Sequence, residues 1–80
     1  MSEGLVTSNK VHRAIFVEVF AGNRDPAHIA KKARIIRPVA DRAIADLERT
    51  GILAREGEEI KLTPAGERLA HDLKRKELLS

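Results

Sequence analysis

The segment DPAHIAKKARIIRPVADRAIADLERTGIL, from Asp25 to Leu53, decides the fold because it encodes two short helices joined by a tight turn. Asp25 followed by Pro26 is typical of a helix start. The carboxylate can accept hydrogen bonds from the first free backbone amides. Proline has no N–H, but an N–H at the first helical position would have no partner within the helix. Pro38 marks the start of the second helix in the same way. Because the residue before proline is pushed out of helical geometry, we expect the turn at Ile35 to Arg37.

The second helix is expected to have two distinct faces. At about 3.6 residues per turn, one narrow arc is apolar and predicts the side that packs on the core, while the opposite arc predicts an outward face of cations and small residues. Thr50-Gly51 ends this helix, and the apolar pair that follows can begin a strand. The first arc holds Ala40, Ala43, Ile44 and Leu47, and the second holds Pro38, Arg42, Ala45 and Arg49.

A helix is also predicted before this segment, from Val11 to Ala21, where the sequence reads VHRAIFVEVFA. Thr7 or Ser8 can cap it, and Gly22-Asn23 ends it. This helix is apolar nearly all the way round, so it needs two burial partners. One partner is the helix pair, and the other is either the C-terminal helix or the same region of a second subunit.

After the helix pair, two alternating stretches predict a β-hairpin, and a last helix follows. The strands are Ile52-Leu53-Ala54-Arg55 and Ile60-Lys61-Leu62, with Glu56-Gly57-Glu58-Glu59 at the tip. Thr63 is expected to cap the last helix, with Pro64 at its first position. Its inner face is predicted to carry Ala65, Leu69 and Leu73, and Leu78 and Leu79 lie off that face, where they either fray or form a dimer contact.

This order of elements resembles the winged-helix transcriptional regulators, the broad group that includes the MarR, ArsR and PadR families. The resemblance covers about Val11 to Leu73. It runs through Ala40, Ile44, Leu47 and Gly51-Ile52-Leu53, and then through Leu62-Thr63-Pro64-Ala65-Gly66-Glu67-Arg68-Leu69, which is similar to the "LTxxGxxL" ending of the group. It implies a mainly α fold with a small β-hairpin: one winged helix-turn-helix domain over residues 1–80, with a three-helix core, the helix-turn-helix at 25–50, the wing at 52–62 and a C-terminal helix at 64–78.

Composition sets further bounds. A chain of 80 residues forms one small domain that buries only about 60 to 65% of its unfolded surface, which leaves no room for a large catalytic cleft. Cysteine is absent, and neither a signal peptide nor a membrane span is recognisable, so we expect a cytoplasmic protein without membrane contact. The net charge of +3 and the pI near 9.7 favour a polyanion as partner where the cations segregate. The high charged fraction is common in heat-adapted proteins and suits a thermophilic prokaryote.

Duplex DNA binding needs a slim helix face with hydrogen-bonding groups near its N-terminal end. Arg42 is our first choice for a base or phosphate contact, because the resemblance favours arginine at this position and arginine binds guanine N7 and O6 through two hydrogen bonds. Pro38 and Val39 are candidates for contact with thymine methyl groups. Ala45, one turn further on, is small enough to allow close approach to the bases.

Charged neighbours complete the predicted interface. Asp41 is expected to orient Arg37 or Arg42, or to accept from cytosine N4. Phosphate contacts provide affinity and its salt dependence rather than sequence choice. The candidates for these contacts are Lys31, Lys32 and Arg34 near the turn, and Arg55 and Lys61 on the strands of the wing.

The wing departs from the family pattern because its tip is acidic. Glu56, Glu58 and Glu59 would face phosphates with like charge. Either the wing stands away from the duplex and only Arg55 and Lys61 reach the backbone, or the wing serves another partner.

No enzyme is recognisable in this chain, and no cofactor, metal or small-molecule ligand is predicted. His12, His28 and His71 fall on three different helices without metal-ligand spacing, so we expect them to be exposed or at an interface. The Glu58-Glu59 pair lies at a turn with no pocket to raise a pKa. No serine or threonine has a base beside it, and no glycine-rich phosphate loop exists.

The sequence therefore predicts a homodimeric transcriptional regulator that inserts its second helix-turn-helix helix into the major groove of duplex DNA. Three alternatives stay open: a protein-interaction module that uses the acidic wing or the first helix, a chromatin-type protein that coats DNA without sequence preference, and a solvated, salt-bridged helix that touches nothing. RNA is disfavoured, because no surface aromatic side chains are available to stack on bases.

Overall fold

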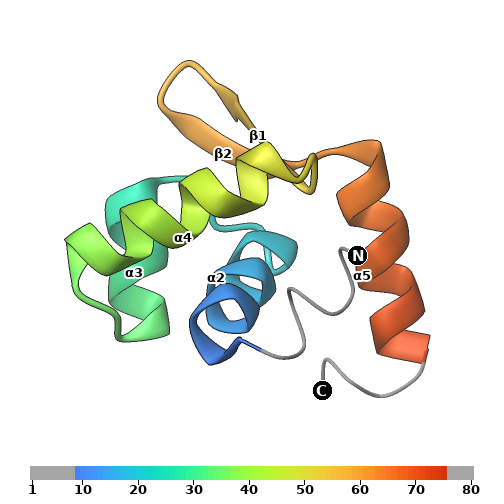
Figure 1. Ribbon diagram of the computed structural model, residues 1–80, viewed down its shortest axis with the longest axis horizontal. Helices are drawn as coiled ribbons and strands as arrows, with labels where there is room; N and C mark the ends of the chain where they lie inside the picture. The colour runs from blue at the N-terminus through green and yellow to red at the C-terminus, as the bar shows by residue number, and fades with distance from the viewer. Residues whose placement is uncertain (1–8, 76–80) are drawn as a thin grey trace.

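The structure of the protein, a computed structural model, describes residues 9–75. It contains helices α2 (Lys10–Phe20), α3 (Pro26–Ala33), α4 (Arg37–Arg49) and α5 (Pro64–Arg75), and strands β1 (Leu53–Glu56) and β2 (Glu59–Leu62). Figure 1 shows α2 in the middle of the fold, α3 and α4 together on one side, α5 on the other, and the hairpin beyond α4. The prediction of a mainly helical chain with a small β-hairpin is confirmed. No helix in the described region is long and apolar enough to span a bilayer.

The starts of α3 and α4 follow from the two proline signals. The Asp25 carboxylate accepts from the His28 amide at 3.2 Å, and Pro26 is the first residue of α3. The helix α4 begins one residue earlier than expected, because Arg37 is helical and Ile36 is the N-cap. The Ala40 amide donates to the Ile36 carbonyl at 3.0 Å, and this bond closes the first turn in spite of the preference that Pro38 imposes on Arg37.

The cap of α2 is Asn9, so the prediction of Thr7 or Ser8 was wrong. The Asn9 side chain accepts from the Val11 amide at 2.9 Å and from the His12 amide at 3.2 Å. Asparagine is among the best N-cap residues because its short side chain reaches these free donors. Thr7 and Ser8 lie outside the described residues.

The core lies where α2, α3, α4 and the hairpin meet. Ile15 and Phe16 of α2 and Ile44 and Leu47 of α4 are fully buried. The arc predicted for the core side of α4 is buried throughout, including its two alanines, which confirms the assigned face. The remaining buried apolar residues are Val19, Ile29, Ala30, Ala40, Ala43, Ile52, Leu53, Ile60, Ala70 and Leu73.

The second face of α2 is partly covered by α5. Val11, Val17 and Phe20 are half-buried. The ring of Phe20 meets the ring of His71 edge to face, with centroids 6.2 Å apart. Of the two partners considered for this face, the C-terminal helix therefore provides at least part of the cover. Leu78 and Leu79, proposed as a dimer contact, lie outside the described residues.

The inner face of α5 differs from the prediction at one position. Leu73 is buried and Leu69 is half-buried, as expected, but Ala65 is exposed. Gly66 and Ala70 are buried instead. The helix approaches the rest of the fold through these small residues, so its inner face contains Gly66 and Ala70 beside Leu69 and Leu73, and Ala65 lies outside it.

A close contact at Gly66 joins the last helix to the hairpin. The Thr63 hydroxyl accepts from the Gly66 amide at 3.0 Å, and the Thr63 amide donates to the Ile52 carbonyl at 3.0 Å. A Cβ atom at position 66 would clash with the carbonyl oxygen of Ile52. Glycine is thus required here by the close approach of two backbones.

The hairpin pairs Leu53 with Leu62 and Glu56 with Glu59 across a two-residue turn. Gly57, the first turn residue, has a φ of +65°, as the first central residue of a type II′ turn requires. Beyond the ladder, the Ile60 amide donates to the Arg24 carbonyl at 2.7 Å, which joins β2 to the segment just before α3.

Candidate nucleic-acid interface

The outward face of α4 carries the residues predicted to contact bases. Pro38 and Arg42 are exposed, Val39 is 40% exposed, and Ala45 is half-buried. The buried arc of the same helix fixes this orientation, because Ala40, Ala43, Ile44 and Leu47 pack on the core. The face predicted from helical periodicity is therefore accessible.

Asp41 interacts with Arg37, which is one of the two arginines it was expected to orient. The Arg37 Nε donates to Asp41 Oδ1 at 3.0 Å, one turn apart on α4. Both side chains are about half exposed, and exposed ion pairs contribute only about 0 to 1 kcal/mol. The pair orients Arg37 along the helix edge without holding it there firmly.

Four of the cations predicted to contact DNA are exposed and have no ion-pair partner among residues 9–75. They gather on two neighbouring segments, the end of α3 with its turn and the outward face of α4. An unpaired cation keeps its full charge for a phosphate, whereas a paired one must first lose its partner. The four are Lys31, Lys32, Arg34 and Arg42.

Arg34 ends α3 in a left-handed conformation, with φ 60° and ψ 43°. It is the one non-glycine residue with positive φ in the described region. This conformation costs an L-residue with a Cβ atom about 1 to 2 kcal/mol, and glycine is the usual residue at this helix-end position. The chain therefore holds a strained arginine at the turn between α3 and α4, and no glycine signal in the sequence announces it.

The two strand cations predicted to contact phosphates, Arg55 and Lys61, do not form a common surface. The Arg55 Nη2 donates to Glu48 Oε1 of α4 at 3.0 Å, and Lys61 forms an ion pair with Glu56. Because side chains alternate along a strand, Arg55 shares a face with buried Ile60, while Lys61 shares the outer face with Glu56. Arg55 and Lys61 thus lie on opposite faces of the hairpin, and both already have acidic partners.

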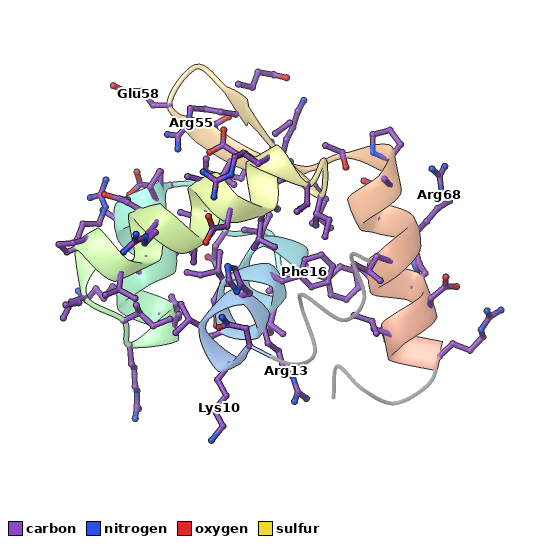
Figure 2. All side chains as sticks on the ribbon, in the orientation of Figure 1. Lys10, Arg13, Phe16, Arg55, Glu58 and Arg68 are labelled. Carbon is purple, nitrogen blue, oxygen red and sulfur yellow. The ribbon has the colours of Figure 1, made fainter. Side chains whose placement is uncertain are left out.

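The tip of the hairpin is acidic, as expected. Glu58 occupies the turn and is exposed, and Figure 2 shows it at the tip of the hairpin, close to Arg55. Glu56 and Glu59 are directly opposite each other, which is unfavourable for like charges. The hydrogen bond and the positive charge of Lys61 lower the pKa of Glu56 and offset this repulsion.

His12 is buried, which corrects the prediction that the histidines are exposed or at an interface. It is 7% exposed, and its Nε2 lies 3.2 Å from Asp46 Oδ2. Asp46 also forms an ion pair with Arg49, so one carboxylate joins α2 to the outward side of α4. The spacing could have revealed this, because His12 precedes Ile15 and Phe16 by three and four residues and shares their face.

The other two histidines, His28 and His71, are exposed. Within residues 9–75, no three His, Asp or Glu side chains come close enough to hold a metal ion. The described region has a concavity of about 370 Å³ between α2, β2 and α5, away from the outward face of α4.

Ile36 is an exposed residue of the interface that the sequence analysis missed. It is 69% exposed and directly precedes α4. Ile36 and Val39 are the large apolar residues that the described region exposes. The exposure of Ile36 was not predicted, because an isoleucine in a turn between two helices is usually expected to pack against the core.

No protein-family model matches this chain, and no curated protein matches it either. Among solved structures, it is similar to the crystal structure of an O-methyltransferase from neocarzinostatin biosynthesis in complex with S-adenosyl-L-homocysteine. The two share 29% sequence identity with a TM-score of 0.65, and the match covers 85% of this chain. It covers only 22% of the methyltransferase, so this chain corresponds to about a fifth of that enzyme's length.

This similarity shows that the arrangement of helices and hairpin also occurs as a small part of a larger enzyme. It assigns no role to Arg42 or its neighbours, because the methyltransferase is in complex with S-adenosyl-L-homocysteine and not with a nucleic acid. The activity of the whole enzyme does not follow from a fifth of its chain. The absence of an enzyme activity therefore stays a prediction for this protein.

Proposed function

We propose that this protein is a winged helix-turn-helix domain that binds duplex DNA with sequence preference and acts as a small transcriptional regulator. The observation that carries the proposal is the gathering of Lys31, Lys32, Arg34 and Arg42, all exposed and without ion-pair partners in the described region, beside the outward face of α4. In this arrangement α4 enters the major groove, and the cations of α3 and the turn contact phosphates.

The helix α4 is suited to this position because its outward face is narrow. Ala45 at the middle of that face is small, and Arg42 lies one turn before it without an ion-pair partner among residues 9–75. A free arginine on a slim helix face can bind guanine through two hydrogen bonds, which is the commonest specific contact to a base. Arg37 can also contact a phosphate once its ion pair with Asp41 is broken.

The hairpin has a different role from a basic wing. Its tip carries Glu58, and its Arg55 is tied to Glu48 of α4. We propose that the hairpin supports α4 through this ion pair and keeps its acidic tip clear of the phosphates. Of the two strand cations, only Lys61 on the outer face remains a candidate for the DNA backbone.

A homodimer is part of the proposal because most operators are symmetric and dimers bind two half-sites. The large apolar content of α2 motivated this prediction, although α5 covers part of that helix. In such a dimer the two copies of α4 would occupy successive major grooves, one helical turn apart.

A protein-interaction module is the second candidate. The acidic hairpin tip, with Glu56, Glu58 and Glu59, is the surface most suited to a basic protein partner.

The test is a salt series of binding to the promoter duplex of the protein's own gene and to an unrelated duplex of equal length, with the mass determined on the same sample. Tight, promoter-selective binding by a dimer is expected. Equal binding to both duplexes would indicate DNA coating, and no binding at low salt would favour the interaction module.

Charge variants locate the interface in the same assay. Lys32→Gln with Arg42→Gln should weaken binding: loss of the Lys32 phosphate contact reduces the salt slope by about 0.9, and loss of the Arg42 base contact lowers the preference for the promoter duplex. Arg68→Gln with Lys74→Gln is the matched control, because it removes the same charge from exposed sites on α5 (Figure 2 shows Arg68 pointing away from α4). Equal effects of the two pairs would contradict the proposed interface.

A further inference from the structure

Ile36 combines two unfavourable features at the start of α4. It is the N-cap residue and makes no side-chain hydrogen bond to the helix, whereas Asn9 and Asp25 cap α2 and α3 through their side chains. It is also 69% exposed. Isoleucine is among the poorest N-cap residues, and Ser, Thr, Asn or Asp would stabilise the helix. The chain thus keeps an exposed apolar side chain where a polar one would give a more stable fold.

Val39 extends this apolar surface. It is 40% exposed and lies three residues after Ile36, across the first turn of α4. Residues three apart around a helical turn lie on the same side. We call Ile36 and Val39 the apolar tip of α4.

The surroundings of the apolar tip suit a polyanion. Lys31, Lys32 and Arg34 precede it, and Arg42 lies one turn after Val39, with which it lines a shallow hollow of about 170 Å³. None of these four cations has an ion-pair partner within residues 9–75. An apolar protein partner would not require these four unpaired cations near the apolar tip, whereas the phosphates on both sides of a major groove would attract them.

Few polar groups on α4 are free to read bases. Arg37 is paired with Asp41, and Arg49 is paired with Asp46. Arg42 is the arginine of α4 without such a partner in the described region. A face with one free donor group can read about one base pair by hydrogen bonds, so further selectivity has to come from apolar contact. The apolar group in the major groove is the C5-methyl group of thymine.

We infer that Ile36 is a specificity-determining residue, and that with Val39 it contacts thymine C5-methyl groups beside the base pair read by Arg42. The inference rests on the proposed function and specifies the base feature that the site selects. Burial of one methyl group corresponds to roughly a fourfold change in affinity.

The test replaces thymine by uracil, because this change removes only the methyl group. The full chain is first used to select binding sequences from a random duplex library. The best duplex is then remade with uracil at one thymine position at a time. We expect about a fourfold loss of affinity at one or two adjacent positions and no loss elsewhere.

Two variants connect this loss to Ile36. Ile36→Ser should bind the thymine and uracil forms equally, while melting about 4 to 8 °C higher because it gains an N-cap. Ile36→Thr is the matched variant: it gains the same cap and retains a methyl group, so it should keep part of the discrimination. The higher melting temperature shows that lost discrimination is not caused by unfolding.

The outcomes separate the inference from the function on which it rests. Equal affinity of the wild-type protein for thymine and uracil forms, or unchanged discrimination by Ile36→Ser, would overturn the inference and leave DNA binding intact. Dissociation of a dimer by Ile36→Ser with unchanged discrimination would also overturn it and identify the apolar tip as a contact between copies. No binding to any duplex at low salt would overturn the proposed function as well.

Discussion

Gly66 packs directly against the backbone of Ile52, so that a Cβ atom at position 66 would clash with the carbonyl oxygen and lie 3.2 Å from the carbonyl carbon. The contact joins α5 to the residue that leads into β1. Since both partners are backbone, neither can move aside as a side chain could. This contact is a direct link between the LTxxG segment and the hairpin.

Gly66→Ala should therefore destabilise the protein by about 1 to 3 kcal/mol, in the range of overpacked cores. Helix propensity alone predicts the opposite sign, because alanine is favoured over glycine inside helices by about 1 kcal/mol. Urea unfolding decides between them. Ala65→Gly, at the exposed neighbouring position, is the control and should cost only the propensity difference. A more stable Gly66→Ala variant would contradict the close approach.

Arg34→Gly is expected to stabilise the fold by about 1 kcal/mol, because glycine adopts the left-handed conformation at φ 60° without strain. The same change should weaken binding to duplex DNA and lower its salt slope by about one unit, because a phosphate contact is lost. Arg34→Lys should keep the binding but not gain stability. Unchanged binding by Arg34→Gly would remove this residue from the interface.

His12 and Asp46 should be energetically coupled, because the buried imidazole has the Asp46 carboxylate as its hydrogen-bond partner. A double-mutant cycle with His12→Ala and Asp46→Ala is expected to give a coupling of about 0.5 to 1.5 kcal/mol. The exposed pair Arg75 and Asp72 provides the control cycle, for which we expect a smaller coupling. Equal coupling in both cycles would mean that the buried pair does not hold α2 against α4.

Glu56 and Lys61 should make the hairpin sensitive to acid. Lys61 lowers the pKa of Glu56 below its ordinary value of 4.5. A carboxylate with a depressed folded pKa contributes stability that is present above its unfolded pKa and is lost as the pH falls through the folded value. This contribution should therefore be complete at neutral pH and disappear below pH 4.5.

The variant Lys61→Met tests this assignment by NMR titration of the Glu56 carboxyl group. Its pKa should rise, since the hydrogen bond and charge of Lys61 are gone while Glu59 still lies opposite. Lys10→Met, at an exposed position on another element, should leave the titration unchanged. A Glu56 titration that does not respond to Lys61→Met would exclude the ion pair in solution.

The order of elements could be predicted because its signals are local. Asp25-Pro26 and Pro38 each place a helix start within one residue, and the periodic arc around Leu47 identifies the core side of α4. Gly57 and the alternating residues around it predict the hairpin. These signals depend on backbone geometry and on burial, which act over a few neighbouring residues.

The interface was harder to predict because it depends on contacts between elements. The pairing of Arg55 with Glu48 of α4 involves two segments whose relative position the sequence does not reveal. The left-handed Arg34 has no glycine signal, and the exposure of Ile36 follows only from how the turn lies on the fold. His12 is the exception: it was wrongly predicted to be exposed or at an interface, although its spacing to Ile15 could have indicated its burial.

The bond from the Ile60 amide to the Arg24 carbonyl has a consequence for the order of unfolding events. A two-stranded hairpin alone opens easily, and its amides then exchange with solvent. Here the Ile60 amide is held by a residue far away in the chain, next to the start of α3. Its hydrogen exchange should therefore require separation of β2 from the helical core, and Ile60 should be among the slowest-exchanging amides, while the neighbouring tip around Glu58 exchanges fast.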